Sequence, residues 1–249
     1  MVFEYFSEGK RIVGRVLWLS IINALLSLLS ISELIKVITF RGIHYGLKVT
    51  LPKPVPLLWD FVSLPKVNAY LLPLPLSILL GYLIIVFQSF IIGGYLGTIL
   101  CAVKGTSKCD FLDYSKRYFK SILGYSLLWY TLIVILITFP SSPLVIALII
   151  LYFVIYYFIY ATPFIIVSQS LDLKRALSLS VEVAKEREFL CYTLTYALVT
   201  LMISIPLTVI TVNGKFGGIM AGLLFSSVPA LWLSASTMVL IVKVVEKTT

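Results

Sequence analysis

The sequence predicts an all-α polytopic membrane protein, a bundle of six transmembrane helices with two cytoplasmic amphipathic helices. The chain has 249 residues, of which 60% are hydrophobic and only 12% are charged. Its mean hydropathy is +1.04, and charge-free stretches reach 51 residues. An ordinary soluble domain is about a quarter charged and just under half apolar. This composition argues against a soluble enzyme, a disordered chain and a disulfide scaffold, and we expect one membrane domain over residues 1–249.

The charge-free stretches locate the spans, because a helix needs about 20 apolar residues to cross the hydrocarbon core. The longest, residues 121–171, is too long for one span and carries Pro140-Ser141-Ser142-Pro143 in its middle, which predicts a helical hairpin. The stretch 67–103 begins with a proline-containing segment, so its helix is expected to start near residue 74. The expected spans are residues 12–36, 74–103, 121–140, 144–169, 189–212 and 216–243.

The distribution of Lys and Arg predicts the orientation. With six spans, the two termini and the loops 104–120 and 170–188 share one side and hold 14 of the 20 cations. We therefore expect both termini in the cytoplasm of a cell membrane, with the longest loop, residues 37–70, outside.

The outer loop has a pattern of its own. Apolar and polar residues alternate from Ile43 to Leu51, which predicts a short extended strand. Residues 57–63 are expected to form a short interfacial helix. The loop is too small to fold alone, so we expect it to lie on the outer ends of the spans, with His44 as a surface residue.

Both longer cytoplasmic loops predict amphipathic helices. Ser107 followed by Asp110 reads as a variant capping box ahead of a helix that runs into the third span. In the second loop Ser170 is the expected cap, with an apolar stripe from Leu173 to Ala184. Such helices can lie in the headgroup plane or be simple extensions of the spans, and both interpretations stay open. Five cations on these helices are expected to contact anionic lipids: Lys116, Arg117, Lys120, Lys174 and Arg175.

Chemistry-bearing residues are scarce. No Asp, Glu, Lys, Arg or His falls in the interior of any expected span, because the charged residues within the span bounds lie near the span ends. This argues against proton relays, ion-coupled pumps and voltage sensors. One histidine cannot form a His-Glu-x-x-His metal site. The three cysteines, Cys101, Cys109 and Cys191, suggest neither a disulfide framework nor a zinc site. We expect no catalytic residue, metal or cofactor, and no nucleic-acid partner.

Two patterns in the spans have a functional and a structural interpretation. Gly93-x-x-x-Gly97 allows close helix approach, either in a homodimer or within the bundle. Tyrosines recur at helical spacing and, with Gln88, could line a cavity for a lipid-like or cationic ligand, or could simply pack between helices. They are Tyr152, Tyr156, Tyr160, Tyr192 and Tyr196.

Three prolines fall inside expected spans. Pro163, Pro206 and Pro229 are expected to kink their helices, as hinges or as static bends. The order span, turn, amphipathic helix and span occurs twice with a shift of 65 residues, which indicates a weak internal repeat.

The segment from Gly93 to Tyr114 resembles a family of uncharacterised prokaryotic, archaeal-type multipass membrane proteins. Residues 160–167, followed by Ala176-Leu177-Ser178-Leu179-Ser180, are similar to the proline-bearing span and the helix after it in that group. A distantly similar membrane domain precedes glycerophosphodiester phosphodiesterases. The resemblance covers residues 80–205 and implies the fold, but it carries over no catalytic residue and no phosphodiesterase activity.

The function expected from these features is contact. We expect a non-catalytic integral membrane protein that acts on membrane lipids or a partner membrane protein, which includes a second copy of itself. The alternative is a permease or export component for a hydrophobic or lipid-like solute, not coupled to protons or ions through buried charges.

Overall fold

The computed structural model describes residues 2–66, 73–106, 108–138 and 144–248, and the described residues are mainly helical, with no strand among them. The prediction of an all-α membrane protein is confirmed. Five helices are long and apolar enough to cross a membrane, or six if one bent pair forms a single span. The contacts divide the chain into two compact units, Met1–Leu71 with Leu190–Val239, and Leu72–Phe189 with Leu240–Thr249.

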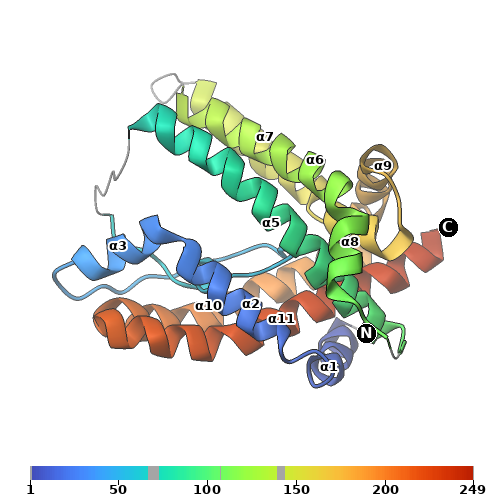
Figure 1. Ribbon diagram of the computed structural model, residues 1–249, viewed down its shortest axis with the longest axis horizontal. Coiled ribbons are helices and arrows are strands. Elements are labelled where there is room, and N and C mark those ends of the chain that lie inside the picture. The colour runs from blue at the N-terminus through green and yellow to red at the C-terminus, as the bar shows by residue number, and fades with distance from the viewer. Residues whose placement is uncertain (1, 67–72, 107, 139–143, 249) are drawn as a thin grey trace. The chain divides into compact units, whose positions relative to one another are not determined.

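The first unit contains four N-terminal helices and most of two long C-terminal ones (Figure 1). The four are α1 (Val2–Val13), α2 (Leu19–Leu29), α3 (Ile31–Thr39) and α4 (Leu58–Phe61). The long helices are α10 (Arg187–Asn213) and α11 (Lys215–Thr248), which extend into the second unit as well. Gly214 forms the tight turn between them, and Gly218 lies in the first turn of α11, where a Cβ would overlap the Ile210 carbonyl.

The region of the expected first span, residues 12–36, is not one continuous helix. Residues 2–13 form the separate helix α1, and α2 and α3 are bent by 67° at Ser30. Ser30 leaves the helical region with φ −79° and ψ 67°. The Oγ of Ser27 donates to the Asn23 carbonyl (2.7 Å) and accepts the backbone N–H of Leu58 (2.9 Å), which ties the bend to α4.

The second unit is built from α5 (Leu74–Val103), α6 (Phe111–Thr138), α7 (Leu144–Ile159), α8 (Thr162–Gln169) and α9 (Leu173–Ala184). Its helices α5 and α6 pack along one another (Figure 1).

The predicted turn at residues 140–143 lies outside the described residues. Pro163 sits in the first turn of α8, just after the break between α7 and α8 at residues 160–161. Pro206 and Pro229 lie inside continuous helices α10 and α11.

The structure shows how α6 and α9 begin. Helix α6 begins at Phe111, and the Asp110 carboxylate accepts the N–H groups of Leu112 (2.9 Å) and Asp113 (3.2 Å), so Asp110 caps this helix. The predicted cap Ser107 lies outside the described residues. Asp172 precedes α9, whereas Ser170 ends α8 in the left-handed region with φ 53°. The predicted amphipathic segments are thus the start of α6 and the separate helix α9.

Candidate functional site

An extended limb, residues 43–50, runs along α10 in the first unit and replaces the predicted strand. Its N–H groups donate to side chains of α10 instead of to a neighbouring strand. The bonds run from His44 to Asn213 Oδ1 (2.9 Å), from Lys48 to Ser204 Oγ (2.9 Å) and from Thr50 to Thr200 Oγ1 (3.4 Å).

The positions of these bonds show that the limb is fully extended. Thirteen residues of α10 separate Asn213 from Thr200, a rise of about 20 Å at 1.5 Å per residue. Six residues of the limb cover that distance, which gives roughly 3.3 Å per residue, the rise of a strand. The predicted alternation also holds: Ile43, Tyr45, Leu47 and Val49 are 60–73% exposed, whereas Thr50 is buried.

The inner face of the limb contacts residues 59–63, the return segment of the same loop. The Lys48 ammonium donates to the Trp59 carbonyl (2.6 Å), and the Thr50 hydroxyl donates to the Asp60 carbonyl (2.5 Å). The return segment is itself bonded to α10, since the Ser63 N–H donates to Thr208 Oγ1 (2.9 Å). The loop therefore forms a hairpin that is latched to α10 on both of its limbs.

This hairpin corrects the expectation that the loop lies on the ends of the spans. Thr200 is the midpoint of α10, a helix long enough to cross a membrane, so the limb reaches halfway along a candidate span. The hairpin also carries an ion pair, because Lys53 Nζ lies 2.5 Å from the Asp60 carboxylate. Charged groups thus lie beside a span whose own interior is uncharged.

Lys48 belongs to the same group and lies outside the membrane-spanning helices. Burial lowers the pKa of Lys48 from its ordinary value, and the nearby Asp60 carboxylate offsets part of that effect. Only the alternating pattern of residues 43–51 hinted at this site from the sequence. The hydroxyls of α10 gave no signal because Ser and Thr are common in membrane helices.

The second unit gathers exposed cations at the start of α6 and of α9, and we call these five residues the basic end. They are Lys116, Arg117, Lys120, Lys174 and Arg175. One Nη of Arg117 donates to Ser170 Oγ (3.2 Å), and the Tyr118 hydroxyl lies 3.3 Å from the same oxygen. These contacts bring the first turns of α6 beside the junction of α8 and α9.

Helix α9 packs on its own unit. Ala176, Ser180, Val183 and Ala184 are buried, and Ser180 Oγ donates to the Phe158 carbonyl (3.0 Å). The Tyr157 hydroxyl also donates to the Ala184 carbonyl (3.1 Å). Protein contacts therefore cover part of the apolar face of α9.

The predicted tyrosines fall into two separate clusters. In the second unit, Tyr152 and Tyr156 pack on Trp129, with centroid distances of 5.1 and 5.0 Å, and the buried Tyr160 stacks on Phe189 at 5.0 Å.

In the first unit, Tyr192 is fully buried, stacks on Phe6 at 5.0 Å and has its hydroxyl 2.9 Å from Thr237 Oγ1. Tyr196 is also fully buried, with its ring 6.2 Å from that of Tyr192. Aromatic packing and a hydroxyl contact between helices, one of the two predicted roles, describe these residues. Gln88 is half-buried on α5 of the second unit.

The glycines of α5 meet α6 of the same chain. A Cβ on Gly97 would lie 2.5 Å from Cγ of Tyr114, and one on Gly93 would lie 3.3 Å from the Ser115 carbonyl oxygen. A Cβ on Gly94 would lie 2.7 Å from the ring of Phe111. The Gly93-x-x-x-Gly97 pattern thus serves close packing inside the second unit.

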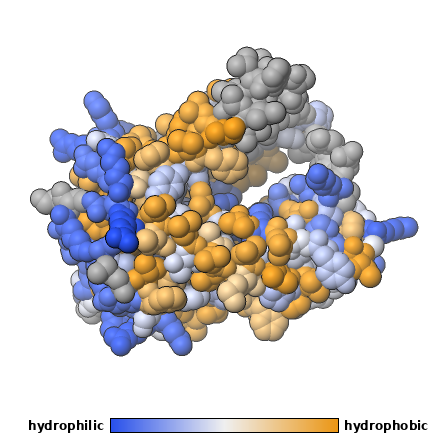
Figure 2. All heavy atoms as spheres, turned by 180° about the vertical axis from the view of Figure 1, so that it is seen from behind, coloured by the Kyte–Doolittle hydropathy of each residue, from blue (hydrophilic) through white to orange (hydrophobic). Residues whose placement is uncertain are grey.

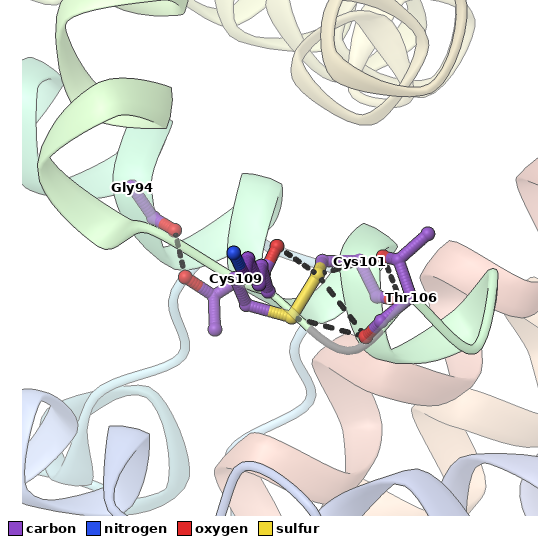
Figure 3. Close-up of a disulfide and its surroundings, with 6 residues drawn as sticks. Gly94, Cys101, Thr106 and Cys109 are labelled. Carbon is purple, nitrogen blue, oxygen red and sulfur yellow. Dashed lines mark hydrogen bonds between the residues drawn. A yellow bond between two sulfur atoms is a disulfide. The ribbon is translucent and has the colours of Figure 1, made fainter.

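The expectation about cysteines is wrong. Cys101 and Cys109 form a disulfide with a Cα–Cα distance of 5.8 Å (Figure 3). Thr106 belongs to the loop that the disulfide closes, and its Oγ1 donates to the Cys101 carbonyl (3.0 Å). The spacing of eight residues did not suggest a pair, because only the turn at Gly105, with φ +69°, brings the two sulfurs together. Cys191 is a free thiol.

No family model, curated protein or solved structure matches this chain. In the part of the chain that the structure describes, no group of three or more His, Cys, Asp or Glu residues could hold a metal ion.

Proposed function

We propose that the protein is a non-catalytic integral membrane protein that acts by contact with anionic lipids through its basic end. The observation that supports this best is the clustering of five exposed cations from two helices, joined through Arg117 and Ser170. Each Lys or Arg near an anionic surface contributes about 1 kcal/mol of attraction. Figure 2 shows apolar side chains over much of the visible surface, with hydrophilic side chains gathered in separate groups.

The proposal includes an orientation in a cell membrane. Both termini and the basic end lie in the cytoplasm, and the bent pair α2–α3 serves as the first of six spans. The excess of Lys and Arg in the termini and in the loops 104–120 and 170–188 supports a cytoplasmic location for these segments, because cytoplasmic loops are enriched in Lys and Arg. Cysteines introduced at Lys116 and Arg41 test it: an impermeant thiol reagent added to intact cells should label only Arg41→Cys, and labelling of Lys116→Cys would reverse the orientation.

Lipid contact is tested in nanodiscs with and without anionic lipid. The variant Lys116→Gln/Lys120→Gln/Lys174→Gln neutralises three exposed cations of the basic end. We expect anionic lipid to raise the thermal unfolding midpoint of the wild type and to have less than half that effect on the variant.

The matched control is Arg41→Gln/Lys66→Gln/Lys215→Gln, which removes the same charge from three exposed cations elsewhere. It should respond to anionic lipid as the wild type does. Equal losses in the two triple variants would show that net charge alone matters, and would refute contact through the basic end.

The extended limb favours permeation as a second candidate function. Non-helical backbone at membrane depth occurs where it is buried in protein or lines a water-filled cavity. The limb reaches the midpoint of α10, and the hairpin to which it belongs carries Lys48, Lys53 and Asp60. These polar groups would accommodate the headgroup of a lipid-like solute at that depth.

Water access at the limb tests this second candidate. In a Cys191→Ser background, the buried Thr50→Cys should react with a charged, impermeant thiosulfonate if water reaches the deep end of the limb. Leu47→Cys, on the exposed apolar row, is the control and should react poorly in lipid. An unreactive Thr50→Cys in the bilayer that reacts after unfolding would reject a water-lined path.

A further inference from the structure

We propose that Cys101–Cys109 is a thiol–disulfide exchange site that faces the cytosol and sets the state of the basic end. The proposal rests on the proposed lipid contact and orientation. Cytosolic reductants keep most thiols reduced, so disulfides on that side of a membrane are usually transient, catalytic or redox-sensing. A disulfide in a loop that the Lys and Arg distribution places in the cytosol is therefore expected to open and close.

The bond lies where it can control the start of α6. Cys101 is in the last turn of α5 and is 3% exposed, whereas Cys109 is half-buried and directly precedes the capping residue Asp110. The closed disulfide fixes the position of Cys109, which precedes the cap of α6, relative to α5. When the disulfide is open, two hydrogen bonds still hold the connection between α5 and α6. The backbone N–H of Thr106 (3.1 Å) and its hydroxyl (3.0 Å) both donate to the Cys101 carbonyl.

The start of α6 leads directly to the basic end. Phe111 and Tyr114 occupy the close contacts with Gly94 and Gly97, so the first turn of α6 is seated on α5. Lys116 and Arg117 follow within one turn. Fraying of that first turn would loosen the seating of Tyr114 and the bond from Arg117 to Ser170, and would disperse the cations.

The exchange follows ordinary dithiol chemistry. A thiolate of a partner dithiol attacks Sγ of Cys109, the more exposed sulfur, and the Cys101 sulfur leaves with the bonding electrons and takes up a proton. The second thiol of the partner, as a thiolate, attacks the partner sulfur of the mixed disulfide and releases the Cys109 thiolate, which is protonated in turn. The partner is oxidised to a disulfide and the two cysteines are reduced. The reverse reaction with an oxidised partner restores the bond. Lys104 and Lys108, both exposed, lie within the loop that the disulfide closes.

The experiment uses the full chain in nanodiscs that contain anionic lipid, before and after treatment with dithiothreitol. Gel shift with a maleimide-linked polymer counts the free thiols, and the thermal midpoint reports lipid contact. We expect dithiothreitol to expose two further thiols and to reduce severalfold the stabilisation by anionic lipid. The variant Cys101→Ser/Cys109→Ser should behave like the reduced protein with or without dithiothreitol, and Cys191→Ser should behave like the wild type.

Thiol counting in growing cells completes the test. Rapid alkylation should find both reduced and oxidised protein, and a bond that is fully oxidised in cells and resists dithiothreitol would overturn the proposal. Unchanged lipid stabilisation after full reduction would overturn it too.

Failure of the proposed function looks different: the oxidised wild type would then show no dependence on anionic lipid at all. In that case, faster amide exchange over residues 104–116 on reduction would still support the exchange site, and unchanged exchange would reject it.

Discussion

The pair α5–α6 in the second unit and the pair formed by the extended limb and α10 in the first are held together by opposite means. Each helix of α5–α6 satisfies its own backbone, so the contact needs only close approach, and Gly93, Gly94 and Gly97 provide it by lacking side chains. The limb cannot satisfy its own N–H groups. It depends on side chains that α10 presents.

Those side chains are spaced to suit their task. Thr200, Ser204 and Thr208 recur every four residues and so lie on one face of α10. Each accepts a backbone N–H, from Thr50, Lys48 and Ser63. The glycine contact therefore depends on shape and tolerates no added volume, whereas the limb depends on acceptors and tolerates no loss of a hydroxyl.

The largest effect is expected from adding volume to the glycine contact. Gly97→Leu would drive its side chain into Tyr114 and separate α5 from α6. Overpacking of this kind costs roughly 1–3 kcal/mol, and we expect a value at the upper end because a whole side chain is added. Unfolding in mild detergent, followed by circular dichroism, measures the loss.

Gly217→Leu is the control for that change. Gly217 is exposed in α11, and nothing lies within 4 Å of a Cβ placed there. Leucine is the better helix former, so this variant should be neutral or slightly stabilised. Similar losses in the two variants would mean that the α5–α6 contact is not the sensitive one.

A smaller loss is expected from removing one acceptor under the limb. Ser204→Ala leaves the N–H of Lys48 without its acceptor on α10, and an unsatisfied buried donor costs about 1–3 kcal/mol. Amide exchange in the limb should accelerate before the protein unfolds. Thr195→Val is the control on the same helix, because the Thr195 hydroxyl donates only to the Cys191 carbonyl of α10 itself (2.9 Å). Equal acceleration in both variants would argue against the latch.

The helical part of the fold was readable from the sequence because hydropathy and length dominate in a membrane. Charge-free stretches located α5, α10 and α11 closely. The bend at Ser30 was not readable, since it depends on the contact between Ser27 and Leu58, 31 residues away. The helix 2–13 was not predicted, because most of it lies outside the expected spans that were located from the charge-free stretches.

The two contact regions differ in how much their sequences reveal. The glycines of α5 are a recognisable motif, and the choice between a dimer and internal packing needed only the position of α6. The limb has a recognisable period of two, but its partners are hydroxyls on a helix about 150 residues later, and nothing in the sequence links the two segments. The basic end is intermediate, because its cations were identified but their link through Ser170 was not.

The smallest effect, and the one that sharpens the comparison most, concerns the charge on the limb. Burial lowers the pKa of Lys48 below its ordinary value of 10.5, so the folded protein disfavours the charged form. Between the folded and unfolded pKa values the unfolded chain binds more protons, and stability rises with pH in that window.

The variant Lys48→Met has no titratable group at this position. We therefore expect the free energy of unfolding of the wild type to rise relative to Lys48→Met as the pH increases toward about 10.5, measured by thermal unfolding in detergent at several pH values. Lys66→Met, which removes an exposed lysine near the end of the same loop, should show no such trend. A wild type that loses stability relative to Lys48→Met over that window would show that the ammonium is stabilised where it lies, and that the charge, like the hydroxyls of α10, helps to hold the limb.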